Sequence, residues 1–295
     1  MANGIIMTDF QKQVIDLVGQ DLCVSEIARR LNRKISSVSS VIARFKLKHK
    51  SKNFNCVNHH YFDNIDSAQK AYFLGLFISD GSVSGSRFSF QLSFDDGKEL
   101  LPVLKKEINS DQKIYFCPEV IDSNGVKYRK PQAKFRWTSK LMTTILNDKY
   151  GIHSRKTYDN DFVFPFDKIP EEFIGSFILG VIDGDGSFEQ SKGVFTPSLI
   201  GNSKYFLEQI GKYVFEFTGL TNKIYTHRGK TCEYYTIRFC ANRKNKYDKI
   251  CKLYNFLYGK NIVCLNRKKV KIINYLQYRA KQLGITPSAS VERRD

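Results

Sequence analysis

The sequence has no long apolar run, few acids relative to bases, and no paired cysteine motif. No apolar stretch reaches the roughly 18 residues that a membrane-spanning helix needs. The N-terminus has neither the basic start and long apolar core of a secretory signal nor the composition of a transit peptide. The seven cysteines are scattered without a CxxC pair, which is typical of reduced thiols. We therefore expect a soluble intracellular protein, cytoplasmic if it is bacterial or from a phage.

The shortage of acids leaves a large positive charge. The 295 residues include 47 Lys and Arg against 29 Asp and Glu, a formal net charge of +18. Such a surplus repels itself unless a polyanion is the partner. The bases alternate along strand-like segments and do not form one basic amphipathic helix, so nucleic acid is favoured over a membrane surface.

Residues 1–48 have the pattern of a helix-turn-helix module. Apolar residues recur at helical spacing in three short segments, namely Phe10, Val14, Leu17 and Val18, then Ile27, Ala28 and Leu31, then Ile35, Val38, Val41, Ile42 and Phe45. The other side of the third segment carries small polar residues, and we expect Ser36, Ser39 and Arg44 to contact DNA. The alternative is a plain helical cap on the main domain. Residues 49–62 are expected to form a polar linker.

An apolar segment with the pattern of a helix occurs twice, 105 residues apart, as YFLGLFISDGS and SFILGVIDGDGS. Small residues recur in each copy at i, i+4 and i+8: Ala71, Gly75 and Ser79, then Ser176, Gly180 and Gly184. A glycine inside a helix costs roughly 1 kcal/mol relative to alanine. Matching glycines in two helices therefore predict that the two small stripes pack against each other.

Each stripe is followed at once by an acid, Asp80 or Asp185. Pairing of the helices brings both carboxylates to one end, where the helix dipoles already place partial negative charge. A divalent cation that prefers oxygen ligands, such as Mg²⁺, would relieve this repulsion.

The segments that follow each helix alternate between apolar and polar residues, as strands with one buried face do. Phe88, Phe90, Leu92 and Phe94 are expected on the buried face of one strand. The opposite faces carry Arg87, Gln91, Lys134, Arg136, Lys223 and Arg238. A sheet of this kind can lie in a major groove and contact base edges, so we expect these six side chains to bind DNA.

FLGLFISDG and ILGVIDGDG resemble the two signature helices of the LAGLIDADG homing endonucleases in their single-chain, two-repeat form. Further matched segments, QKIYF with NKIYT and SRKT with NRKK, extend the resemblance over about residues 58–280. It implies an α+β fold of two pseudo-symmetric αββαββα repeats, whose antiparallel saddle sheets pack on a central two-helix interface. The repeats would be residues 63–165 and 166–282, with a tail at 283–295.

The resemblance also implies roles for individual residues. Asp80 and Asp185 would hold two or more Mg²⁺ or Mn²⁺ ions at the repeat interface. Lys156 and Lys268 would lie beside the scissile phosphates, with Arg155 and Arg267 as alternatives for that role and for DNA contact. In the first copy Ile78 replaces an earlier acid, which the second copy has as Asp183. A polar residue to hold the attacking water is not evident, because Phe94 is apolar where one would be sought.

These features favour a monomeric, site-specific endonuclease that cuts both strands of a long asymmetric DNA target, as in intron homing. One alternative is a DNA-binding transcription regulator with a cleavage-inactive form of the fold; retention of both acids and both lysines argues against it. A second is a maturase that binds intron RNA, which is compatible with cleavage. No membrane partner is expected.

Overall fold

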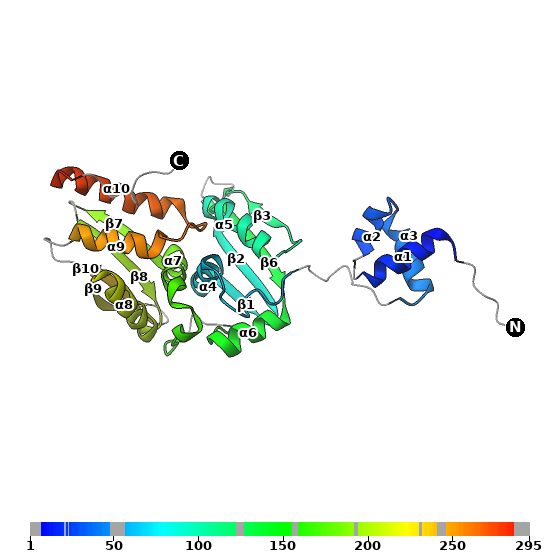
Figure 1. Cartoon of the computed structure of the whole chain (residues 1–295), viewed down its shortest axis with the longest axis horizontal. Coiled ribbons are helices and arrows are strands. Elements are labelled where there is room, and N and C mark those ends of the chain that lie inside the picture. The colour runs from blue at the N-terminus through cyan, green and yellow to red at the C-terminus, as the bar shows by residue number, and fades with distance from the viewer. Residues whose placement is uncertain are drawn as a thin grey trace. The chain divides into compact units, whose positions relative to one another are not determined.

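A computed structural model describes residues 7–20, 22, 24–47, 57–121, 127–154, 159–191, 194–229, 232–240 and 246–285. The chain divides into two compact units, Met1–Cys56 and Val57–Asp295 (Figure 1). In the described ranges no helix combines the length and the apolar character needed to cross a membrane.

The first unit is built from three helices, α1 (Asp9–Gly19), α2 (Val24–Arg30) and α3 (Ile35–Arg44). Helix α1 begins with a capping box, in which Thr8 and Gln11 each accept a hydrogen bond from the other's backbone N–H. The helices share a small apolar core of Val14, Val18, Val24, Ile27, Ala28, Val38, Val41 and Ile42.

The turn between α2 and α3 passes through Asn32, which has a φ of 48°. The Arg33 N–H donates to the Ala28 carbonyl at 2.9 Å, which satisfies the end of α2 in a left-handed turn that asparagine tolerates. The helical spacing of the apolar residues in the third segment implied a buried position for Ile35 as well, and this was wrong, because the residue is 42% exposed. Ile35 is the first residue of α3, ahead of the turns that pack on α1 and α2.

The second unit contains two copies of one arrangement. The first copy consists of α4 (Ala68–Asp80), β1 (Gly81–Ser84), β2 (Arg87–Ser93), α5 (Phe94–Glu107), β3 (Ile114–Cys117), β6 (Gln132–Thr138) and α6 (Lys140–Tyr150). The second consists of α7 (Ile174–Asp185), β7 (Gly186–Ser191), β8 (Val194–Gly201), α8 (Lys204–Thr218), β9 (Thr221–Arg228), β10 (Glu233–Cys240) and α9 (Lys246–Tyr258). The αββαββα order is confirmed for both.

Each copy also has an addition of its own. The first inserts a short hairpin, β4 (Val120–Ile121) and β5 (Lys127–Arg129), between β3 and β6. The second continues into α10 (Asn266–Leu283). Two 3₁₀ turns, Phe166–Lys168 and Glu171–Phe173, connect the copies.

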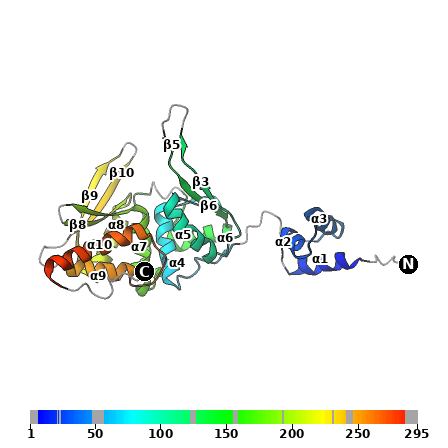
Figure 2. The same cartoon turned by 90° about the horizontal axis from the view of Figure 1, so that it is seen from above.

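The main strands form two equivalent antiparallel sheets, in the orders β1-β2-β6-β3 and β7-β8-β10-β9. Helices α4 and α7 lie side by side at the centre, with one sheet to each side (Figure 1). In a view turned by 90°, β3, β6, β9 and β10 rise above the helices (Figure 2). The expected α+β class, with paired antiparallel sheets on a two-helix interface, is confirmed.

Side chains alternate across the strands as expected. Phe88 and Trp137 stack on the helix-covered face of the first sheet, with ring centroids 5.2 Å apart. The expectation for Phe94 was wrong, because β2 ends at Ser93. The Ser93 hydroxyl accepts from the Asp96 N–H at 3.2 Å and caps α5, so Phe94 begins a helix instead of ending a strand.

The expected linker at residues 49–62 ends earlier than the sequence indicated. Val57, Tyr61 and Phe62 are buried in the core of the second unit. The Tyr150 hydroxyl donates to the Phe62 carbonyl at 3.0 Å and ties this segment to α6. These three apolar residues were assigned to the linker because polar residues surround them in the sequence. Residues 49–56 lie outside the described residues.

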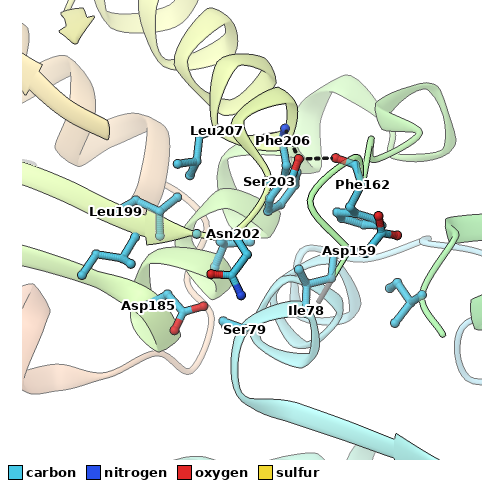
Figure 3. Close-up of a pocket in the computed structure, with 14 residues that line it drawn as sticks. Ile78, Ser79, Asp159, Phe162, Asp185, Leu199, Asn202, Ser203, Phe206 and Leu207 are labelled. Atoms are coloured by element: carbon cyan, nitrogen blue, oxygen red, sulfur yellow. Dashed lines mark hydrogen bonds between the residues drawn. The ribbon is translucent and has the colours of Figure 1, made fainter. Parts of the chain in front are cut away.

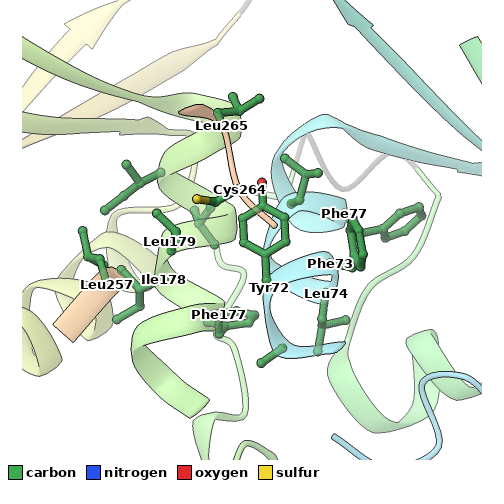
Figure 4. Packing of buried hydrophobic residues seen from close by; sticks show 14 of the residues in the cluster. Tyr72, Phe73, Leu74, Phe77, Phe177, Ile178, Leu179, Leu257, Cys264 and Leu265 are labelled. Carbon is green, nitrogen blue, oxygen red and sulfur yellow. The ribbon is translucent and has the colours of Figure 1, made fainter. Parts of the chain in front are cut away.

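The two central helices touch backbone to backbone. A methyl group added to Gly75 would overlap the Phe177 carbonyl, and one added to Gly180 would overlap the Tyr72 carbonyl. Apolar side chains of both helices fill the space around this contact (Figure 4). The predicted pairing of the two small stripes is therefore present in the structure.

We expect Gly180→Ala to destabilise the second unit by about 3 kcal/mol or more, because the new methyl group meets backbone atoms that cannot rotate away. Urea unfolding followed by fluorescence of Trp137, the single tryptophan, measures the change. Ser176→Ala is the matched control. Its hydroxyl lies in the same stripe, is buried and has no hydrogen-bond partner in the described part of the chain, so its removal should leave stability equal or higher. Equal effects of the two changes would contradict the close helix contact.

Candidate active site

The two acids lie where each central helix passes directly into a strand. Helix α4 ends at Asp80 and β1 begins at Gly81, while α7 ends at Asp185 and β7 begins at Gly186. Both glycines have ordinary extended backbone angles, with φ of −78° and −94°. They are needed because a side chain at either position would collide with the last turn of its own helix. The Asp-Gly pairs thus mark a sharp exit from a helix.

The helix contact brings the two acids together. A methyl group on Gly184, the neighbour of Asp185, would lie 3.2 Å from Asp80 Oδ2 and would overlap the Ser79 side chain. Asp80 is half-buried and Asp185 is exposed. Mg²⁺ is usually bound through one or two carboxylates together with water and substrate phosphates. Two carboxylates at the C-termini of two paired helices therefore suit a hard divalent cation.

A cavity of about 220 Å³ lies beside Asp185, between the end of α4 and the corner where β8 leads into α8. Asn202, from this corner, lies near Asp185 and Ser79 (Figure 3). Sequence reasoning missed Asn202 because it sought a polar residue only in the first copy, at Phe94. A comparison of the two copies could have identified Asn202. The helix after each corner is capped by a serine, Ser93 or Ser203, and the residue before that serine is Leu92 in one copy and Asn202 in the other.

Lys268 lies at this end of α7 but is buried, with 3% of its surface exposed. Its ammonium group donates to the carbonyls of Ile182, Asp183 and Gly186 at 2.6–2.8 Å. Burial lowers the pKa of Lys268 to about 8, against the attraction of Asp183 and Asp80. The lysine thus adds a charged donor where α7 passes into β7. Asp183 is among the last four residues of α7, whose carbonyls the helix itself leaves without partners, whereas the Ile182 carbonyl also accepts from the Gly186 N–H.

Arg267 is engaged in a different way. Its Nε and Nη2 atoms donate to the two carboxylate oxygens of Asp96 at 2.7 and 2.9 Å, which joins α10 of the second copy to α5 of the first. This pairing raises the pKa of Arg267. Burial acts to raise the pKa of Asp96, but the hydrogen bonds from Arg267 and Ser93 outweigh it and hold the pKa below its usual value. Glu99, one turn along α5, accepts from the Asn266 N–H at 3.0 Å.

Asp183 is a buried bridge between the copies. One of its oxygens accepts from the Tyr72 hydroxyl of α4 at 2.9 Å and from the Leu265 N–H at 2.8 Å, whereas Oδ1 is buried and has no partner among the described residues. Burial raises the pKa of Asp183 to about 6 despite these hydrogen bonds. The cross-copy bond to Tyr72 was not predicted, since nothing in the sequence links the two positions.

The other expected site residues fall into two groups. Those on the open faces of the sheets and of α3 are at least partly exposed: Arg87, Gln91, Lys134, Arg136, Lys223 and Arg238, with Ser36, Ser39 and Arg44 on α3. Arg155 and Lys156 lie outside the described residues. The structure thus brings together Asp80, Asp185, Arg267 and Lys268 at one end of the helix pair, with the basic sheet faces beside them.

Two antiparallel four-stranded sheets on a tight helix pair, with an acid at the end of each central helix, define the two-repeat LAGLIDADG fold. Residues 172–252 match the family described as the LAGLIDADG-like domain. This range runs from just before α7 into α9 and so covers most of the second copy. The family resemblance expected from the sequence is confirmed.

The chain is similar to several solved structures. One is of mesophilic variants of the homing endonuclease I-DmoI, with 14% identity, a TM-score of 0.43, and coverage of 69% of this chain and 96% of that chain. Another is the homing endonuclease I-WcaI bound to its DNA recognition sequence, with 13% identity, a TM-score of 0.45, and coverage of 71% and 87%. A third is the N-terminal LAGLIDADG domain of DUF199/WhiA, with 14% identity, a TM-score of 0.41, and coverage of 72% and 93%. No curated protein matches the chain.

We expect Asp183→Asn to flatten the pH dependence of stability between about pH 4 and pH 6. The folded pKa is above the unfolded one, so the free energy of unfolding contributed by this group is lost as the pH rises through that window. At pH 7 the ionised, buried carboxylate costs roughly 3 kcal/mol, most of which the neutral amide should recover. Urea unfolding across this pH range in the presence of a chelator tests it. Glu189→Gln, at an exposed site, is the control. Parallel curves for wild type and Asp183→Asn would contradict this account.

Lys268→Met is expected to destabilise the second unit by about 2–3 kcal/mol, because three carbonyl groups lose a charged donor inside the protein. The same Trp137 unfolding assay measures this loss. Lys271→Met, an exposed change on the same helix, should have little effect. A lysine that served only to contact phosphate would instead be replaceable without loss of stability.

Proposed function

We propose that the protein is a site-specific endonuclease that hydrolyses both strands of a DNA target. The single observation that carries this proposal is the contact of the Gly75 and Gly180 stripes, which delivers Asp80 and Asp185 to one end of a helix pair. The polar, basic faces of two sheets flank that end. A net charge of +18 suits a nucleic-acid partner.

In this proposal Asp80 and Asp185 would hold Mg²⁺ or Mn²⁺. Such ions, when bound, neutralise charge on a scissile phosphate and activate water. The half-buried and exposed positions of the two carboxylates leave them open to an approaching backbone. Asn202 would orient a water molecule beside Asp185, a role that Leu92 cannot fill in the first copy. We also propose that Lys156 or Arg155 supplies positive charge to one phosphate.

The two basic residues of the second copy are not arranged as expected. Lys268 Nζ is directed to three backbone carbonyls and Arg267 is paired with Asp96. We propose that Lys268 acts by fixing the end of α7, and with it Asp185. Arg267 is held by Asp96, so its remaining N–H groups would be the ones left to contact a phosphate.

The first unit would add DNA contacts of its own. The exposed face of α3 carries Ser36, Ser39 and Arg44, whose small polar and basic side chains suit a groove. The two sheets present different residues at matching positions, so a target read by one monomer would be asymmetric.

A second candidate is a DNA-binding regulator that does not cleave. One observation favours it: both basic residues of the second copy, Arg267 and Lys268, are hydrogen-bonded to groups of the protein itself. Asp80 and Asp185 would then serve no chemical purpose.

Cleavage of a randomised duplex library in Mg²⁺ separates the two functions. We expect recurrent cut sites, and a loss of roughly 100-fold or more with Asp80→Asn or Asp185→Asn, since each removes charge from the site. Binding to the same sequences should persist or improve, because an acid near the phosphates is gone. Asp111→Asn, an exposed acid beyond α5, is the control. Selective binding without cutting by the wild type would support the regulator instead.

A further inference from the structure

Two cations face each other on the open side of the second sheet. The pairing of β9 with β10 places Lys223 opposite Arg238 and Ile224 opposite Ile237. Ile237 is buried beneath the sheet, whereas Lys223 and Arg238 are exposed on the other side. Like charges directly opposed on neighbouring strands destabilise a sheet.

Nothing in the described part of the chain neutralises this pair, since neither cation has a carboxylate within ion-pair distance there. The Tyr225 ring lies 5.3 Å from the Lys223 ammonium and 5.3 Å from the Arg238 guanidinium. Contacts of this kind offset part of the repulsion and restrict where the guanidinium can point. A free protein that keeps two such cations together holds a site ready for an electron-rich ligand.

We propose that Lys223, Tyr225 and Arg238 form a guanine-reading subsite in the half-site bound by the second repeat; this rests on the proposed function. Arg238 lies on β10, an inner strand of the sheet, and so faces the middle of a groove. Its planar fork matches the O6 and N7 acceptors of guanine. Lys223 lies on the edge strand β9, closer to the backbone of the duplex, where a flexible point charge suits a phosphate.

The first repeat has the same residue types without the cluster. Arg136 lies on the matching strand β6, opposite Ser89. The pairing of β3 begins only at Ile114, so Lys113 is outside the strand. The Tyr115 ring is 59% exposed and no cation of the described residues lies over it. Tyr115 is therefore the matched control for Tyr225.

The test selects duplexes from a randomised library with the full chain in the absence of divalent metal, then measures affinity for each single-base variant of the preferred sequence. We expect a required guanine in one half-site, and Arg238→Lys should lower its preference over other bases by about tenfold or more. Tyr225→Ala should lower the same preference severalfold, whereas Tyr225→Phe should retain it. Lys223→Met should weaken all duplexes equally and reduce the salt dependence by about one phosphate contact.

Tyr115→Ala should leave the preferences at this position unchanged, and Trp137 fluorescence confirms that each variant is folded. Uniform weakening of all duplexes by Arg238→Lys would assign this arginine to a phosphate and overturn the inference, while leaving the proposed function intact. A wild-type chain that selects no duplex at all would remove the proposed function and the subsite with it.

Discussion

The contact between two glycine-bearing helices determines where everything else in the second unit lies. At Gly75 and Gly180 the helices touch through backbone atoms, so their separation cannot change without losing the contact. Each helix passes directly into the first strand of its own sheet. The helix pair therefore fixes the two sheets relative to each other and brings Asp80 and Asp185 to the same end. Other helices and loops could vary without moving this frame.

A second constraint acts on one end of the pair. The chain from Val263 to Lys268 crosses from the second copy to the first, where Gln69 bonds Val263, Glu99 bonds Asn266 and Asp96 pairs with Arg267. Lys268 then returns to the carbonyls of α7. The surroundings of Asp185 are thus built by both copies. An isolated second copy would lack the acids that hold this crossing segment in place.

The frame could be predicted from the sequence because it depends on local periodicity and on a repeat. The stripe of small residues, the acid that follows it and the buried face of each strand can all be read from residue spacing within one segment. The crossing segment could not be predicted, since the partners of Lys268, Arg267 and Asp183 are set by tertiary contact. The predictions for Phe94 and Ile35 failed for a related reason. Each is the first residue of a helix, and the direction of a side chain depends on whether its residue belongs to the helix or to the segment before it. Arg267 and Lys268 looked equivalent in the sequence, yet the first residues of α10 place one on the surface and the other inside.

Duplication explains the fold, and divergence at a few positions gives the copies different chemistry. The residue before the corner serine is Leu92 in one copy and Asn202 in the other, and the amide of Asn202 lines the cavity beside Asp185. The first copy inserts a separate two-stranded hairpin, β4 with β5, whereas a closely packed group of two cations and a tyrosine lies on the sheet of the second copy. None of these differences disturbs the helix contact, because all lie at corners, edges or open faces. A scaffold fixed by backbone packing leaves such positions free to change, so the two copies can differ on their open faces while Asp80 and Asp185 stay at the same end of the helix pair.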